Sequence, residues 1–231
     1  MKFLLTSAGL RNDDLVKALG QLLGKPFNEA AVVFVTTAAN LDIGDKSWLL
    51  EDIDRFKAVG FKTVKVVDIA GFSVEEFASS LLHIDLVCFG GGNERYLAHI
   101  IEKGGFKKVL TSFLERGGVY MGISAGSMVP GAFLPREVSD QIFTEEDSGD
   151  WEGESMEFFD LAFIPHLNSP WFKFGKDRLE GLKDKFDVTV YATDDETAIK
   201  IDGEEIEIVG RGETWIQMLM VASDHDPLMT E

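Results

Sequence analysis

A serine between two glycines stands at residues 122–126, which read Gly-Ile-Ser-Ala-Gly. An apolar run, 119–123, leads into Ser124, and small residues follow it. This G-x-S-x-G spacing is typical of a nucleophile elbow, because a tight strand-to-helix turn has no room for side chains beside the hydroxyl. The pattern predicts that Ser124 projects at the carboxyl edge of a sheet, where the N–H of Ala125 can stabilise an oxyanion. A turn that serves only packing is the alternative.

Three consecutive glycines form a second feature, Phe89-Gly-Gly-Gly-Asn93, between an apolar strand and a predicted helix over 94–101. Glycines leave backbone N–H groups uncovered, so such a loop can bind phosphate or supply the second donor of an oxyanion hole. The spacing of phosphate-binding loops is absent, which favours the oxyanion role. We expect the second donor to be Gly91 or Gly92, opposite Ala125, and Asn93 to contact substrate.

A serine nucleophile needs a base to accept its proton, and His166 is the best candidate. It follows the apolar run 161–165, so we expect it at a strand end on the same rim as Ser124. His83 and His99 lie in or at the ends of helical stretches, and His225 lies in a polar tail. A purely structural role is the alternative for His166.

An acid must hold the histidine in the correct tautomer. Asp194, Asp195 and Glu196 lie between two predicted strands, whereas Glu137 and Asp140 lie nearer to Ser124 along the chain. Residue types alone leave this choice open.

Five short apolar runs must position these residues. They alternate with helical stretches, an order that predicts a parallel sheet whose ligands gather at the carboxyl ends of the strands. Leu15, Leu19 and Leu22 share one helical face, the segment 48–59 repeats that pattern with Trp48 expected in the core, and Ser73-Val-Glu-Glu predicts a capping box. The runs are 3–6, 31–36, 63–67, 86–89 and 119–123.

The last third of the chain has a different character. The segments 186–192, 197–201 and 205–209 are predicted strands with short turns between them, one of them Asp202-Gly203, which indicates an antiparallel hairpin at the sheet edge. The segment 137–160 holds ten acids and no Lys or Arg. We expect it to form a long solvated loop, with a mobile cover over a site as the alternative.

Composition limits the class of protein. At 231 residues and 45% apolar, the chain predicts one soluble domain over residues 1–231. A net charge of −18 argues against nucleic acid and anionic membranes as partners. One cysteine, Cys88, and four scattered histidines suggest neither disulfide nor metal site, and the start of the chain lacks the features of a signal peptide, so we expect a cytoplasmic protein without metal or cofactor.

The ordered motifs resemble those of the peptidase E family, aspartyl dipeptidases that are related to the cyanophycinases. The order is strand–GGGN, strand–G-x-S-A-G, Pro-His, and D-D-E-T-A-I before a hairpin, and the likeness covers residues 2–217. It includes Leu4-Leu-Thr-Ser and Val35-Thr-Thr-Ala-Ala-Asn40. The resemblance implies an α/β, three-layer sandwich with a mostly parallel central sheet, similar to class I glutamine amidotransferases, plus a C-terminal antiparallel hairpin.

The resemblance also implies site roles. Ser124 matches the nucleophile, His166 the base and Asp195 the acid, while Cys88 does not match the nucleophile. Since Asp is one methylene shorter than Glu, which the family also uses there, Glu196 is the substitute if Asp195 does not reach the histidine.

Gly91 or Gly92 with Ala125 match the oxyanion donors of the family. The nearest candidate for the basic residue that pairs with a substrate Asp carboxylate is Arg178. On the surface of a helix, Arg178 also fits a solvated position.

We therefore expect a serine exopeptidase that hydrolyses dipeptides or short peptides with a free amino terminus, Asp-X among them, as a monomer or homodimer. One alternative is a cyanophycinase-like hydrolase of β-aspartyl-arginine peptides. The other is a non-catalytic relative that binds peptides.

Overall fold

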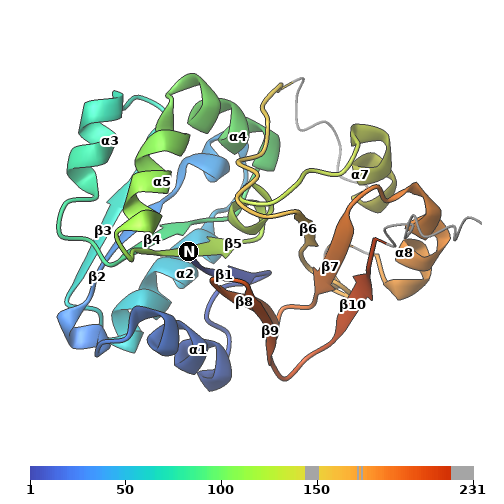
Figure 1. Ribbon diagram of the computed structural model, residues 1–231, viewed down its shortest axis with the longest axis horizontal. Coiled ribbons are helices and arrows are strands. Elements are labelled where there is room, and N and C mark those ends of the chain that lie inside the picture. The colour runs from blue at the N-terminus through green and yellow to red at the C-terminus, as the bar shows by residue number, and fades with distance from the viewer. Residues whose placement is uncertain (144–150, 171, 173, 220–231) are drawn as a thin grey trace, which may run out of the picture.

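The structure, a computed structural model, describes residues 1–143, 151–170, 172 and 174–219. Its main element is a seven-stranded sheet with helices on both faces, and a three-stranded sheet lies beside it (Figure 1). The main sheet has the order β3-β2-β4-β5-β1-β8-β9 and the small sheet the order β10-β7-β6. The strands are β1 (Lys2–Thr6), β2 (Ala31–Val35), β3 (Thr63–Val67), β4 (Leu86–Phe89), β5 (Val119–Ile123), β6 (Leu161–Ile164), β7 (Thr189–Thr193), β8 (Thr197–Asp202), β9 (Glu205–Gly210) and β10 (Thr214–Gln217).

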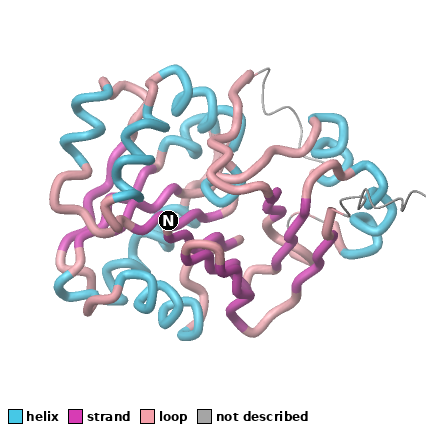
Figure 2. The backbone as a smooth tube through the Cα atoms, viewed as in Figure 1, coloured by secondary structure: helices cyan, strands magenta, loops and turns pink. Residues whose placement is uncertain are grey.

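Helices lie between successive strands from β1 to β7, and turns connect β7, β8, β9 and β10, as the tube in Figure 2 shows. The α-helices are α1 (Asp13–Leu23), α2 (Ser47–Val59), α3 (Val74–Ser80), α4 (Glu94–Lys103), α5 (Phe106–Glu115), α6 (Ala125–Met128), α7 (Arg136–Ile142) and α8 (Lys176–Leu182). The 3-10 helices are η1 (Phe27–Glu29), η2 (Thr37–Leu41) and η3 (Lys183–Lys185). None of the helices in the described segments is long and apolar enough to cross a membrane.

The first five strands are parallel, as the alternating pattern predicts. β1 pairs with β5, β5 with β4, and β2 with both β4 and β3, all in parallel register. The predicted runs agree with the observed strands to within one residue at each end. Because parallel strands end at a common edge, β1, β4 and β5 deliver the residues that follow them to one rim.

Two apolar layers cover the main sheet. On one face α3, α4 and α5 pack over residues such as Val87 and Tyr120, and on the other face α1 and α2 pack over residues such as Val32 and Met121 (Figure 1). The capping box of α3 is confirmed, since Ser73 Oγ accepts from Glu76 N and Glu76 Oε2 accepts from Ser73 N. The expected three-layer α/β sandwich is therefore present.

The C-terminal prediction is correct for one hairpin and wrong for one strand. β8 and β9 form an antiparallel hairpin at the edge of the main sheet. β7 does not join them: it pairs in parallel with β6, because Val190 and Ala192 are buried in the core cluster of the small sheet. The turn also differs, since Asp202 pairs with Glu205 and leaves Gly203, at φ 65°, as the first central residue.

The acidic segment 137–160 is not simply a solvated loop. Its first residues lie in α7, which buries Val138 and Ile142. Met156 is also buried, and its N–H donates to Val129 O at 2.7 Å. Residues 144–150 of this segment lie outside the described residues. Charge alone therefore misled the prediction, because the acids alternate with apolar residues that pack.

Candidate active site

Ser124 lies between β5 and α6, at the rim where the parallel strands end. Its backbone has φ 50° and ψ −114°, a conformation that costs a non-glycine residue about 1–3 kcal/mol. The Ser124 N–H donates to Thr6 O at 2.9 Å, and Ser127 N–H donates to Ser124 O at 2.8 Å. The chain thus makes the tight, strained turn that the G-x-S-x-G spacing predicts.

Close packing explains both glycines of this motif. A Cβ on Gly122 would lie 2.5 Å from Gly126 O, and a Cβ on Gly126 would collide with the carbonyl oxygen of Phe89. Tyr120, below the turn, donates its hydroxyl to Gly126 O at 2.6 Å. Any side chain at 122 or 126 would therefore push α6 away from β4 and β5 and displace the serine.

The glycine loop after β4 is pressed between η2 and the serine turn. Gly92 has φ 128°, and a Cβ on it would collide with the peptide group that joins Ala38 to Ala39. Asn93 N–H donates to Ala38 O at 2.9 Å. Gly91 faces the other way, because a Cβ on it would lie 3.4 Å from Ser124 Cβ. The loop therefore needs glycine for backbone conformation at one residue and for access to Ser124 at another.

Three backbone N–H groups near Ser124 have no acceptor in the described part of the chain. They belong to Gly91, Gly92 and Ala125. Ala125 is the first residue of α6, so no helical acceptor exists for its N–H. Donors of this kind beside a serine hydroxyl are suited to an oxyanion.

His166 is brought to Ser124 from the small sheet, two residues after β6. Its Nε2 lies 3.0 Å from Ser124 Oγ, and its Nδ1 lies 2.7 Å from Asp195 Oδ1. A carboxylate can only accept, so Nδ1 carries the proton and Nε2 is left to accept from the serine hydroxyl. The backbone of His166 is also left-handed, with φ 65°. The three residues form one hydrogen-bonded chain from hydroxyl to carboxylate.

Among the three adjacent acids after β7, only Asp195 faces His166. Asp194 accepts from the backbone N–H groups of Glu196 and Glu213, at 3.0 and 2.6 Å. Glu196 accepts from Asn12 Nδ2 at 2.9 Å. The shorter Asp side chain thus reaches the histidine, and Glu196 is not the residue in contact.

Burial and neighbouring charges shift the pKa of Asp195 in opposite directions. Burial raises the pKa of its carboxyl, whereas the hydrogen bond from His166, the charge of His166 and that of Arg11 lower it, and the pKa ends below its ordinary value. Asp195 is therefore ionised near neutral pH, the state that holds an imidazole N–H and stabilises an imidazolium.

Three residues around Ser124, His166 and Asp195 were not predicted to belong to the site. Phe172 stacks on the imidazole of His166, with ring centroids 4.2 Å apart and planes at 10°. Trp48, expected in the core, is only partly buried, and its ring lies next to Gly91 beside Ser124. Ser7 donates to Thr193 O and accepts from His166 N–H. Ser7 had two signals in the sequence, its position directly after the first predicted strand and its place in the Leu4-Leu-Thr-Ser motif.

Arg178 and Asn93, the two residues predicted to contact substrate, each make a hydrogen bond to the backbone of a neighbouring segment or helix. Arg178, in α8, donates from Nη1 to Ile142 O at 3.1 Å. Asn93 caps α4, with its side-chain oxygen accepting from Tyr96 N–H at 2.7 Å. Both contacts hold helices in place, and neither joins the chain of Ser124, His166 and Asp195.

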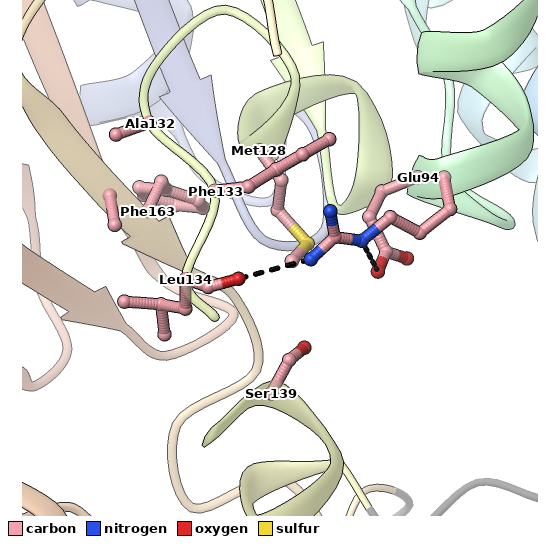
Figure 3. Close-up of a pocket in the computed structure, with 9 residues that line it drawn as sticks. Glu94, Met128, Ala132, Phe133, Leu134, Ser139 and Phe163 are labelled. Atoms are coloured by element: carbon pink, nitrogen blue, oxygen red, sulfur yellow. Dashed lines mark hydrogen bonds and ion pairs between the residues drawn. The ribbon is translucent and has the colours of Figure 1, made fainter. Parts of the chain in front are cut away.

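A small pocket lies beside α6, between the start of α4 and residues 132–134 (Figure 3). Its volume is about 10 Å³, which is roughly the room for one water. Arg95, which lines the pocket, donates to Leu134 O at 3.0 Å, and its guanidinium lies 4.3 Å from the centroid of the Phe133 ring. Ser124, His166 and Asp195 do not line this pocket.

Cys88 is not a competing nucleophile. It is fully buried in β4, and burial, with the charge of Asp52, raises the pKa of its thiol well above the ordinary value. Across the residues for which the structure gives positions, no group of three or more His, Cys, Asp or Glu side chains could hold a metal ion.

Solved structures of other proteins share this fold, and two of them are similar to this chain over most of its length. A protein assigned as a peptidase E from Listeria monocytogenes EGD-e is 19% identical, with a TM-score of 0.75 over 91% of this chain and 98% of that one. A peptidase from an acI-B1 Actinobacterium is 18% identical, with a TM-score of 0.69 over 94% of this chain and 90% of that one. No curated protein matches the sequence.

The sequence profile of peptidase family S51 matches residues 3–209, nearly the whole chain. This range contains the serine turn, the glycine loop, His166 and Asp195. The likeness to peptidase E that the motifs predict is thereby confirmed. The chain belongs to peptidase family S51.

Proposed function

We propose that this protein is a serine exopeptidase that hydrolyses dipeptides or short peptides with a free amino terminus through Ser124, His166 and Asp195. Membership of family S51 makes it a serine peptidase of the peptidase E type. The observation that carries the proposal is a pair of hydrogen bonds, 3.0 Å from Ser124 Oγ to His166 Nε2 and 2.7 Å from His166 Nδ1 to Asp195 Oδ1. The first is short enough for the hydroxyl proton to pass to the imidazole, and the second holds the imidazole in place while Nδ1 keeps its proton.

In the first step Ser124 Oγ attacks the scissile carbonyl carbon while His166 Nε2 takes the hydroxyl proton. Asp195 accepts from Nδ1–H and stabilises the imidazolium that forms. The C–N bond then breaks, and the leaving amine takes the proton from His166 Nε2. A water molecule attacks the resulting ester with His166 again as the base, which releases the acid and restores the serine.

The oxyanion of each tetrahedral intermediate needs N–H donors that are not already hydrogen-bonded to another acceptor. The N–H groups of Ala125 and of Gly91 or Gly92 meet that requirement, because they have no acceptor in the parts of the chain that the structure describes. Gly91 is the better second donor, since it faces Ser124, whereas Gly92 packs on Ala38. Loss of one such donor typically lowers kcat by about 10²–10³.

Charge supports a substrate with a free α-amine. The chain carries 40 acids against 22 bases, so its field attracts a cationic amino terminus and repels an acidic substrate that lacks a specific partner. An Asp-X preference would need a basic residue at the substrate side chain. Arg178 remains our candidate for that contact, and it would have to exchange its bond with Ile142 O for the substrate carboxylate.

The test is a panel of peptides incubated with purified protein and with the Ser124→Ala variant. The panel contains Asp-Leu, Leu-Leu, their N-acetylated forms, a tripeptide, and β-Asp-Arg. We expect release of the first amino acid from free dipeptides, at least tenfold slower release from N-acetylated ones, and none with Ser124→Ala.

The same panel separates the alternatives. Preferred turnover of β-Asp-Arg would replace the proposal by a cyanophycinase-like activity, and tight peptide binding without turnover would replace it by a binding function. An unchanged ratio of Asp-Leu to Leu-Leu turnover in Arg178→Met would remove Arg178 from substrate recognition.

A further inference from the structure

Ser7 is a buried serine that joins the two strands carrying the base and the acid. It follows β1 directly and is 1% exposed. Its Oγ lies 3.0 Å from His166 N, 2.8 Å from Thr193 O and 3.0 Å from Thr193 Oγ1. Thr193 ends β7, two residues before Asp195. One hydroxyl of the main sheet therefore contacts both strand ends of the small sheet that complete the site.

The hydrogen-bonding capacity of this hydroxyl is completely used. A hydroxyl has one proton to donate and two lone pairs to accept with. The Thr193 carbonyl can only accept and the His166 N–H can only donate, so the proton of Ser7 goes to Thr193 O. Thr193 Oγ1 then donates to the second lone pair. Ser7 and Thr193 are both buried, so water does not compete for these positions.

These bonds act on the backbone that aims the imidazole. His166 has φ 65°, a left-handed conformation that a residue with a side chain adopts only when its surroundings hold it there. Ser7 holds the N–H on one side of this residue, and Thr193 O holds the Leu167 N–H on the other, at 3.0 Å. Rotation of either peptide group would swing Nε2 away from Ser124 Oγ.

We propose that Ser7 is a positioning residue, whose hydroxyl fixes the left-handed backbone of His166 and keeps the imidazole aligned between Ser124 and Asp195. This inference rests on the proposed peptidase function. Ser7 acts through His166 and does not itself touch the reacting atoms.

The test is the Ser7→Ala variant, measured on the best dipeptide and with a fluorophosphonate that labels an activated serine. We expect kcat and the labelling rate of Ser124 to fall together by roughly 10- to 100-fold, because small displacements of a base have effects of that size. KM should change by less than about twofold, since Ser7 makes no substrate contact. In a His166→Ala background, Ser7→Ala should cause no further loss, because the two residues act in series.

Two further variants separate positioning from folding. Ser7→Cys keeps the shape of the side chain, with a slightly larger sulfur that hydrogen-bonds weakly, so it should leave no cavity, remain folded and still lose kcat. Ser80→Ala removes a hydroxyl that bonds Phe77 O in α3, remote from the small sheet, and should leave kcat unchanged. Wild-type kcat in Ser7→Cys, or a full additional loss from Ser7→Ala in the His166→Ala background, would overturn the inference.

Proton NMR gives a readout that does not depend on peptidase activity. The His166 Nδ1–H held by Asp195 should give a low-field resonance in the wild type, and this resonance should broaden or vanish in Ser7→Ala and Ser7→Cys. If it does so in a protein that cleaves no peptide, the positioning role stands and the proposed function fails. If the resonance persists in both variants, the positioning role is wrong whatever the protein hydrolyses.

Discussion

The two halves of the site are held in different ways. Ser124 and the glycine loop lie on the main sheet and are fixed by close backbone packing, in which Gly92 and Gly126 lie against carbonyl groups of neighbouring segments. His166 and Asp195 lie on the small sheet and are fixed by hydrogen bonds through Ser7 and Thr193. Steric packing tolerates no larger residue, whereas a hydrogen-bond network fails when one polar atom is removed. The two halves should therefore respond to different substitutions.

The largest effect is expected from Asp195→Asn, in the hydrogen-bonded half. Asn can donate to Nδ1 and so favours the tautomer that cannot accept the serine proton at Nε2. We expect kcat on the best dipeptide to fall by roughly 10³–10⁴ with little loss of stability. Glu196→Gln is the matched control, since that carboxylate bonds Asn12, and it should retain activity. A greater loss in Glu196→Gln than in Asp195→Asn would mean that the acid is assigned wrongly.

The next largest effect is expected from Gly126→Ala, in the closely packed half of the site that holds Ser124. In Gly126→Ala the new methyl would collide with Phe89 O, so α6 must move away from β4. We expect the free energy of unfolding to fall by about 3 kcal/mol or more, measured by urea denaturation. Gly181→Ala is the control, because a Cβ there meets nothing within 4 Å and a helical Ala is favoured by about 0.5–1 kcal/mol. Equal stability of the two variants would show that the serine turn is not held by packing.

The locally packed features are the ones that the sequence predicts well. The five parallel strands and the glycines around Ser124 follow from short runs, because apolar strands and tight turns restrict residue type within a few positions. Residue types alone did not select Asp195, since three adjacent acids differ only in the direction of their side chains; the family resemblance did. β7 was grouped with the hairpin because only the short turn 194–196 separates it from β8, whereas it pairs in parallel with β6. Ser7 was not predicted either, since its contacts with His166 and Thr193 join residues 159 and 186 positions away in the chain.

Asp52, a buried acid in α2, should make the free energy of unfolding depend on pH, an effect of intermediate size. Asp52 in α2 lies against Gly9, and its Oδ1 accepts from Arg55 Nη1 at 2.9 Å. Burial, only partly offset by the charges of Arg55 and Arg11, raises the pKa of Asp52 to about 6 from an ordinary 3.8. Its contribution to stability is therefore complete below about pH 4 and is lost as the pH rises through 6.

Asp52→Asn should remove this pH dependence. Between pH 4 and pH 8 the wild type should lose about 3 kcal/mol of its free energy of unfolding through Asp52, the equivalent of the pKa shift. The variant lacks this loss, so the difference in stability between variant and wild type should change by the same amount in favour of the variant. Asp54→Asn, an exposed neighbour in the same helix that pairs with Lys57, should show no such gain. The prediction fails if both variants follow the wild type at every pH.

The smallest effect is expected from substitution of Phe172, whose ring stacks on the imidazole of His166. Phe172 lies parallel to the imidazole at 4.2 Å and should stabilise the imidazolium of the transition state by about 1 kcal/mol. We expect kcat/KM to fall roughly fivefold in Phe172→Ala, whereas Phe172→Tyr, which keeps the ring face, should stay within about twofold of the wild type. Equal losses in the two variants would assign Phe172 a role other than stacking.

The most direct test of the proposed mechanism is covalent labelling of the protein by a fluorophosphonate, with the modified residue located by mass spectrometry. We expect one adduct, on Ser124, that is absent from Ser124→Ala and forms at least a hundredfold more slowly in His166→Ala. An unlabelled wild type, an adduct on another residue, or a labelling rate that His166→Ala leaves unchanged would contradict this mechanism.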